Sequence, residues 1–268
     1  MSRFEVGSGN AKLSVLVEGE EGLPWLILSN SLAADLHMWD DQLPLLTRTH
    51  QVIRYDTRGH GRSSAPEGPY SFALLVDDMV AILDHLGAAR ADVMGLSLGG
   101  MTALGMGLKD PGRVGRMVVC DARADNPAPF VASWDERIDA IEAGGMEAIV
   151  EGTLGRWFSG NCAPEVMEQA KRMILATSPV GYAGCAQALK ELSYLYQLPQ
   201  LKAPVLYVVG EEDMGAPKDT MAEMSRVTPR SEFVVLPGLA HVPNMENPAA
   251  FAEAVAPWLA AAAQEHTG

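Results

Sequence analysis

The residues with the clearest chemical potential form a G-x-S-x-G pentapeptide around Ser97. Residues 91–94 are typical of a short buried strand, and residues 101–109 of a helix. Between such elements the pentapeptide forms a strained turn that presents the serine Oγ at the positive end of the helix. A tightly packed glycine-rich turn is the alternative, and a dinucleotide-binding loop would need G-x-G-x-x-G, which this segment lacks. We therefore expect Ser97 to be a nucleophile.

A serine hydroxyl needs a general base, so one of the six histidines must reach Ser97. His241 follows the apolar run 232–236 and precedes the last predicted helix, so its loop can return over the nucleophile. His60 lies in a turn bracketed by glycines, and we expect a structural role for it. The remaining histidines are expected to be solvated: His37, His50, His85 and His266. Chain order therefore makes His241 the candidate base.

The base in turn needs a carboxylate that fixes its tautomer. Asp213 lies three residues beyond Gly210, which follows the predicted strand 204–209. This spacing places Asp213 at the carboxyl end of that strand. Glu211 and Glu212 are rivals, although their positions are expected to turn away from the site. Asp121, at the end of the preceding strand, is the other rival. The order serine, aspartate, histidine favours Asp213.

Acyl transfer also requires two donors for a developing oxyanion. The backbone N–H of Leu98, directly after the nucleophile, is expected to be one of them. The second is expected from residues 28–32, LSNSL, which follow an early strand, and the N–H of Ser31 is our candidate. An ordinary polar turn at the end of a strand is the alternative for this segment.

The elements that position these residues alternate along the chain. Strands are expected at 12–18, 25–28, 51–55, 91–94, 117–120, 204–209 and 232–236. A helix is expected from an N-cap at Ser71 to Gly87, and a last helix at 248–260. Short apolar strands separated by helices indicate a parallel sheet covered on both faces. The sequence therefore predicts an α/β protein with a mostly parallel sheet.

Strand signals disappear between about residue 124 and residue 201, where helical patterns dominate. We therefore predict an α/β core formed by residues 1–123 and 203–268, with a helical cap, 124–202, inserted after the strand 117–120.

Composition excludes several classes of function. The chain has 268 residues, 48% of them hydrophobic, and a formal net charge of −14, which disfavours binding to nucleic acid. The three cysteines form no CxxC pair, and no H-E-x-x-H motif is present, so neither a disulfide framework nor a metal is expected. No apolar run is long enough for a membrane span, and a cytoplasmic location is expected, with a removed export signal as the alternative. Oligomeric state is not readable from the sequence.

Together these features resemble the α/β-hydrolase fold, and in particular the 3-oxoadipate enol-lactonase family. The more specific similarity lies in residues 28–32, 35–39, 55–64 and 95–100, and in the segments 134–138 and 156–158 of the predicted cap. The resemblance implies a mostly parallel, eight-stranded sheet with helices on both faces and the helical cap inserted after strand 6. It also implies hydrolysis of a small carboxylated enol-lactone, formed during the breakdown of aromatic compounds in the bacterial cytoplasm, without a cofactor. It assigns the triad to Ser97, Asp213 and His241, and the oxyanion donors to Ser31 and Leu98.

Two positions depart from the family pattern, and the segments that contain them are both expected to adjoin the acyl pocket. Ala33 stands where a glycine is expected, and Asn247 where a glutamine is expected. A broader carboxylesterase or lactonase therefore stays an alternative to the enol-lactonase, and a non-catalytic receptor on this fold a more distant one.

An acidic protein that binds an acidic substrate needs local positive charge. Arg137 and Arg156 in the predicted cap are candidates for it, and Trp134, Trp157 and Phe158 are candidates for the pocket wall. Surface arginines paired with cap acids, and aromatic residues that fill the core of the cap, are the alternatives.

Overall fold

The computed structural model describes residues 2–265, which form an eight-stranded sheet in the order β1-β2-β4-β3-β5-β6-β7-β8. Strand β2 is antiparallel to β1 and β4, and every other pair is parallel. The predicted mostly parallel sheet is therefore confirmed. The strands are β1 (Ser2–Ser8), β2 (Ala11–Glu18), β3 (Trp25–Ser29), β4 (Gln51–Tyr55), β5 (Ala91–Leu96), β6 (Val114–Cys120), β7 (Val205–Gly210) and β8 (Ser231–Leu236).

Seven of these strands correspond to predicted runs, and β1 is the one that the sequence analysis did not locate. Its seven residues, SRFEVGS, contain only two large apolar side chains, so no hydrophobic pattern marks them. The strand forms because the turn after Ser8 returns the chain and pairs Ser8 with Ala11 and Val6 with Leu13. An edge strand of this kind is stabilised by its partner strand more than by its own sequence.

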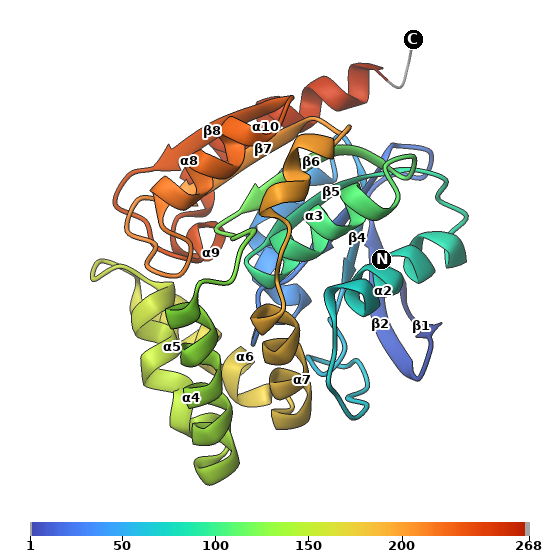
Figure 1. The fold of residues 1–268 in the computed structure, drawn as a ribbon. Coiled ribbons are helices and arrows are strands. Elements are labelled where there is room, and N and C mark those ends of the chain that lie inside the picture. Colours follow the sequence, from blue (N-terminus) through green and yellow to red (C-terminus); the bar gives the residue numbers. More distant parts are fainter. Residues whose placement is uncertain (1, 266–268) are drawn as a thin grey trace.

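Helices connect the strands and cover the sheet (Figure 1). Helix α2 begins after Ser71, whose side chain accepts the N–H of Leu74 as predicted for an N-cap. Helices α2 and α3 contact each other, while α10 contacts α1 and the 3-10 helix η1 on the opposite face. In the core segments the helices are η1 (Leu36–Gln42), α1 (Leu43–Leu46), α2 (Phe72–His85), α3 (Leu98–Lys109), α8 (Lys218–Val227), α9 (Pro243–Glu246) and α10 (Pro248–Glu265).

The segment between β6 and β7 is helical, as expected, and its four α-helices gather near the carboxyl ends of the parallel strands (Figure 1). Its elements are α4 (Ala128–Gly144), η2 (Met146–Ile149), α5 (Val150–Trp157), α6 (Pro164–Ala176), α7 (Pro179–Lys190) and η3 (Leu195–Gln200). We call α4–α7 with η2 and η3 the cap. None of the described helices is long and apolar enough to cross a membrane.

Candidate active site

Ser97 lies at a sharp turn between β5 and α3. Its backbone has φ 55° and ψ −117°, a conformation that is strained for a residue with a side chain. A Cβ on Gly95 would lie 2.2 Å from the carbonyl oxygen of Gly99, and one on Gly99 would lie 2.0 Å from that of Ser29. Both glycines are therefore required for the close approach of strand and helix, as expected for a nucleophile elbow.

The structure brings the three predicted triad residues together. His241 Nε2 lies 2.9 Å from Ser97 Oγ, and His241 Nδ1 lies 2.8 Å from Asp213 Oδ2. Ser97 follows β5, Asp213 follows β7, and His241 follows β8, so all three come from the carboxyl ends of parallel strands. This chain of hydrogen bonds can move a proton from the serine to the imidazole while the carboxylate holds the ring in place.

Asp213 is buried, and its carboxylate is well partnered. Burial alone would raise the pKa of Asp213, but the attraction and hydrogen bond of His241, together with the N–H groups of Gly215 and Ala216, lower it below its usual value. The rivals Glu211 and Glu212 are exposed, as expected from their place in the turn. Asp121 is completely buried, and burial followed by the charge of Asp213 raises its pKa well above normal. Asp213 is thus the ionised carboxylate of the site.

The two expected oxyanion donors lie in different settings. Leu98 is the first residue of α3, where a backbone N–H has no carbonyl one turn earlier to accept it. The N–H of Ser31 donates to Met38 Sδ at 3.4 Å. A thioether is a weak acceptor, so this N–H can be transferred to a stronger, charged acceptor.

Side chains behind the Ser31 loop hold it in place. Asn30 Oδ1 accepts the indole N–H of Trp39 at 2.9 Å, and Asn30 Nδ2 donates to the carbonyl oxygen of Tyr55 at 2.7 Å. The hydroxyl groups of Ser29 and Tyr55 lie 2.8 Å apart. The Ser-Asn pair is therefore a buried polar support for the loop.

The two departures from the family pattern differ in their consequences. Ala33 has φ 65°, which explains why a glycine is expected there, and it lines the pocket. Its N–H donates to His60 Nε2 at 3.0 Å, and burial lowers the pKa of His60 to about 4, so that ring stays neutral and structural as predicted. Asn247 does not line the pocket: it is exposed and its Oδ1 accepts the N–H of Ala250. Its segment nevertheless adjoins the pocket, as expected, through His241.

The expectation of solvated histidines was wrong for His50. Its ring is fully buried, with Nε2 3.2 Å from Asp92 Oδ2 and Nδ1 2.9 Å from Thr49 Oγ1. His37 and His85 are exposed as expected, and His266 lies outside the described residues.

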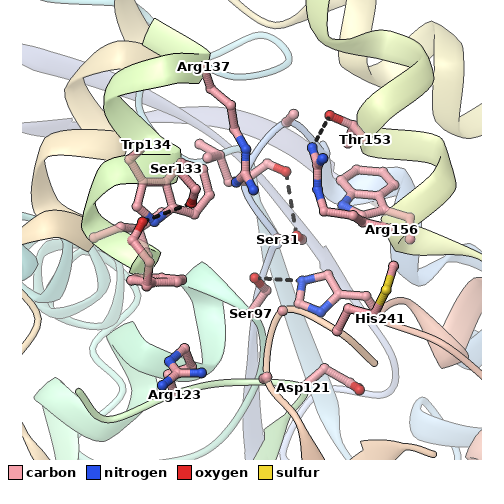
Figure 2. Close-up of a pocket in the computed structure, with 18 of the residues that line it drawn as sticks. Ser31, Ser97, Asp121, Arg123, Ser133, Trp134, Arg137, Thr153, Arg156 and His241 are labelled. Atoms are coloured by element: carbon pink, nitrogen blue, oxygen red, sulfur yellow. Dashed lines mark hydrogen bonds between the residues drawn. The ribbon is translucent and has the colours of Figure 1, made fainter. Parts of the chain in front are cut away.

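A cavity of about 380 Å³ opens above Ser97 and His241, between the sheet and the cap. Four of the five cap residues predicted to line it do so: Trp134, Arg137, Arg156 and Trp157. Figure 2 shows the guanidinium groups of Arg137, from α4, and Arg156, from α5, both pointing into the pocket. Phe158 does not line the cavity and instead packs edge-on against Trp157, with 6.4 Å between ring centroids.

Arg137 and Arg156 have no acidic partner among the side chains that the structure describes, whereas the third arginine of the pocket, Arg123, pairs with Asp125 at 2.9 Å. Arg137 lies 4.2 Å from the centre of the Trp134 ring, and Arg156 donates to Thr153 Oγ1 at 3.3 Å. Burial, and then repulsion from Arg137, lowers the pKa of Arg156. Two uncompensated positive charges at one cavity form a site for an anion.

The lining residues that the sequence analysis did not find include Arg123, Tyr182 and Met214. Arg123 lies three residues beyond the end of β6, and this position at a carboxyl edge was the one available signal. Tyr182 comes from α7, where no local pattern distinguishes a pocket residue from a core residue. Burial raises the pKa of Tyr182, and the charges of Arg137 and Arg156 oppose that increase.

The sheet order, the strained serine turn and the three hydrogen-bonded residues define an α/β hydrolase, and comparison with known proteins agrees. The α/β hydrolase fold family matches residues 24–248, and the chain belongs to it.

Three relatives are particularly informative. The chain is 34% identical to 3-oxoadipate enol-lactonase 2 of Acinetobacter baylyi, over 88% of this chain and 89% of that protein. The enol-lactonase structure from Burkholderia xenovorans LB400 superposes with a TM-score of 0.92 at 32% identity, covering 95% of this chain and 99% of that one. A thermophilic esterase from Thermogutta terrifontis, solved with malate bound, gives a TM-score of 0.90 at 30% identity over 98% and 99%.

Proposed function

We propose that this protein is a cytoplasmic serine hydrolase that opens a small carboxylated enol-lactone, as in the conversion of 3-oxoadipate enol-lactone to 3-oxoadipate during aromatic-compound catabolism. The observation that carries the proposal is one cavity with a hydrogen-bonded serine at its floor and two unpaired arginines in its wall. The triad suits an ester or lactone carbonyl, and the arginines suit a carboxylate on the same molecule. The enol-lactonase relatives support this choice of substrate.

In the first half of the reaction His241 removes the proton of Ser97 as its Oγ attacks the lactone carbonyl carbon. Asp213 stabilises the imidazolium that results. The carbonyl oxygen becomes an oxyanion, which receives the N–H of Leu98 and that of Ser31, the latter leaving Met38 Sδ. Collapse of this intermediate breaks the ring C–O bond, and the enol oxygen departs with the electron pair. The proton that His241 took from Ser97 then passes to this oxygen, which returns the imidazole to its neutral form before water attacks.

In the second half water hydrolyses the acyl-enzyme. His241 takes a proton from the water as its oxygen attacks the acyl carbon, and Ser97 regains its proton when the ester bond breaks. An enol or enolate is a good leaving group, so the first half depends little on protonation by His241. The product carries one carboxylate more than the substrate, and its enol form converts to a ketone.

The substrate carboxylate is assigned to Arg137, with Arg156 beside it. A protein with a net charge of −14 repels anions at long range, but ordinary salt screens that field over about 8–10 Å. Two uncompensated arginines inside the cavity then dominate at short range. The indoles of Trp134 and Trp157 provide flat apolar walls for the ring.

A substrate panel tests the proposal: the enol-lactone, simple neutral lactones and short p-nitrophenyl esters. We expect the highest kcat/KM for the enol-lactone, and a mass increase on Ser97 after reaction with a fluorophosphonate. A fully folded protein that is neither labelled nor active on any substrate would refute the serine hydrolase.

A broader carboxylesterase is the second candidate, favoured by the esterase relative. Such an enzyme would use the same catalytic triad and would differ only in which substrates the residues of the cavity wall accept. Higher kcat/KM for neutral esters than for the enol-lactone would identify this function instead.

A further inference from the structure

Asp121 is a buried carboxyl group with one unused oxygen beside the triad. It follows β6 directly, and its Oδ1 accepts the N–H of Gly210 at 2.8 Å. Its Oδ2 is buried and accepts no hydrogen bond from a described residue, and the side chain of Asp121 shares a hydrogen bond with Asp213 that raises the pKa of Asp121. The backbone there has φ 46°, a strained conformation for a residue other than glycine. A strained residue with an unsatisfied buried oxygen at an active site calls for a functional explanation.

The surroundings of Asp121 give that explanation. Asp121, Asp213 and His241 bring carboxylate and imidazole atoms within 4.8 Å of one another. Two carboxyl groups so close in a buried site do not both ionise. Asp213 holds the negative charge because it has the hydrogen bonds of His241 and of the Gly215 N–H, at 2.8 Å and 2.7 Å. The other ionisable groups that act on Asp121 are Glu246 and Cys120, and neither supplies positive charge.

We propose that Asp121 is a reserve carboxyl group for His241: it is neutral while Asp213 is ionised, and it becomes the anion beneath the imidazole when Asp213 is absent. The inference rests on the proposed serine-hydrolase function. Burial, and after it the charge of Asp213, keeps the proton on Asp121. Removal of the Asp213 carboxylate removes the second cause, and the positive charge of the imidazolium that forms beside Asp121 then favours release of this proton to solvent. The Asp121 carboxylate, already within 4.8 Å of the ring system, stabilises the imidazolium formed when Ser97 loses its proton.

Four proteins test this role: the wild type, Asp121→Asn, Asp213→Ala and the double variant. Asparagine at 121 can keep the Gly210 hydrogen bond, tolerates the positive φ and cannot ionise. The readouts are kcat/KM for p-nitrophenyl acetate and the rate of Ser97 modification by a fluorophosphonate, each from pH 5 to pH 9. Asp213→Asn replaces Asp213→Ala if the alanine variant does not fold, as judged by circular dichroism.

We expect Asp121→Asn to retain activity within about threefold, because a neutral group replaces a neutral group. Asp213→Ala should lose about 10²-fold, and the double variant about 10⁴-fold, which is the loss typical of a triad with no functional acid. In Asp213→Ala the rate should rise with pH as Asp121 ionises, and this rise should be absent from the double variant. If Asp121 had only a structural role, the rate of Asp213→Ala would not rise with pH in a way that depends on the Asp121 carboxyl group.

Equal rates for Asp213→Ala and the double variant across the pH range would overturn the inference while leaving the serine hydrolase intact. A folded wild type that reacts with neither probe would overturn both. The two failures are therefore distinguishable within one experiment.

Discussion

The floor and the wall of the cavity differ in how their polar groups are satisfied. On the floor, Ser97, His241 and Asp213 are joined by hydrogen bonds of 2.9 Å and 2.8 Å before any substrate enters. In the wall, Arg137 and Arg156 have no acidic partner among the described side chains, and the buried Trp134 Nε1 has no acceptor there. The triad is joined by its own hydrogen bonds, whereas the wall has cationic donors without an anionic partner.

This difference separates two tasks. A preorganised floor acts on any ester or lactone carbonyl that reaches Ser97, because its geometry does not depend on the rest of the substrate. Unsatisfied donors in the wall discriminate strongly, because a ligand without a matching acceptor leaves them desolvated and unpaired. Changes to the floor should therefore affect all substrates alike, and changes to the wall should affect acidic substrates selectively.

The largest expected effect is that of Ser97→Ala. Loss of the nucleophile should reduce kcat by about 10⁵- to 10⁶-fold for the enol-lactone and for neutral esters alike. Steady-state kinetics on both substrate classes measure it, with circular dichroism as the control for folding. Near-normal turnover of either class would show that the floor does not carry the chemistry.

Arg137→Ala should affect only one class of substrate. We expect KM for the enol-lactone to rise about 10- to 100-fold, the effect of one charge-assisted hydrogen bond, while KM for a neutral ester stays unchanged. Arg172→Ala is the matched control, because Arg172 is an exposed cap arginine paired with Glu168 at 3.7 Å. Equal changes for acidic and neutral substrates would contradict a carboxylate-binding role.

The same division explains what could be predicted from the sequence. Ser97 is marked by a local motif whose glycines have steric causes, and His241 by its order in the chain. The relation of Asp121 to Asp213 was not readable, because both follow adjacent parallel strands and only three-dimensional packing orders them. Arg137 and Arg156 were identified from the sequence as candidate cations. That both side chains point into one cavity depends on how α4 and α5 pack, which the sequence does not reveal.

Contacts between residues far apart in the sequence account for the remaining errors. His50 was expected in solvent because its partner, Asp92, is 42 residues away and belongs to another strand. No window of local sequence contains both groups. Arg123 was missed for a related reason, since its loop becomes part of the cavity only when the cap lies over it.

Asp121→Asn tests, through the pH dependence of thermal stability, whether Asp121 is protonated in the folded protein. A carboxyl group whose pKa is raised on folding holds its proton in the folded state and loses it in the unfolded state, so stability falls as pH rises above the unfolded value of about 3.9. Asparagine removes this effect. We expect Tm at pH 8 to increase by roughly 3–6 °C relative to the wild type, and the difference to vanish near pH 4. A Tm difference that is the same at both pH values would show that Asp121 is not protonated in the folded protein.

Glu246→Gln should have the smallest effect, and it tests whether floor and wall are mechanically linked. Glu246 Oε2 accepts the N–H of Ala240, next to His241, and Oε1 accepts the N–H of Ser159 at the end of the α5 segment, each at 2.9 Å. Glutamine keeps one acceptor oxygen and turns an amide donor toward the other N–H, so one charge-assisted hydrogen bond is lost. Differential scanning fluorimetry should show Tm lowered by about 3 °C.

Kinetics on both substrate classes complete this test. Because the bridge joins the histidine loop to the cap segment that follows Arg156, its loss should lower kcat/KM about two- to fivefold for acidic and neutral substrates equally. Glu168→Gln, on the exposed surface of α6, is the matched control for loss of one negative charge. A selective effect on acidic substrates would mean that Glu246 acts only through Arg137 and Arg156. The bridge would then not link the histidine loop to the cap.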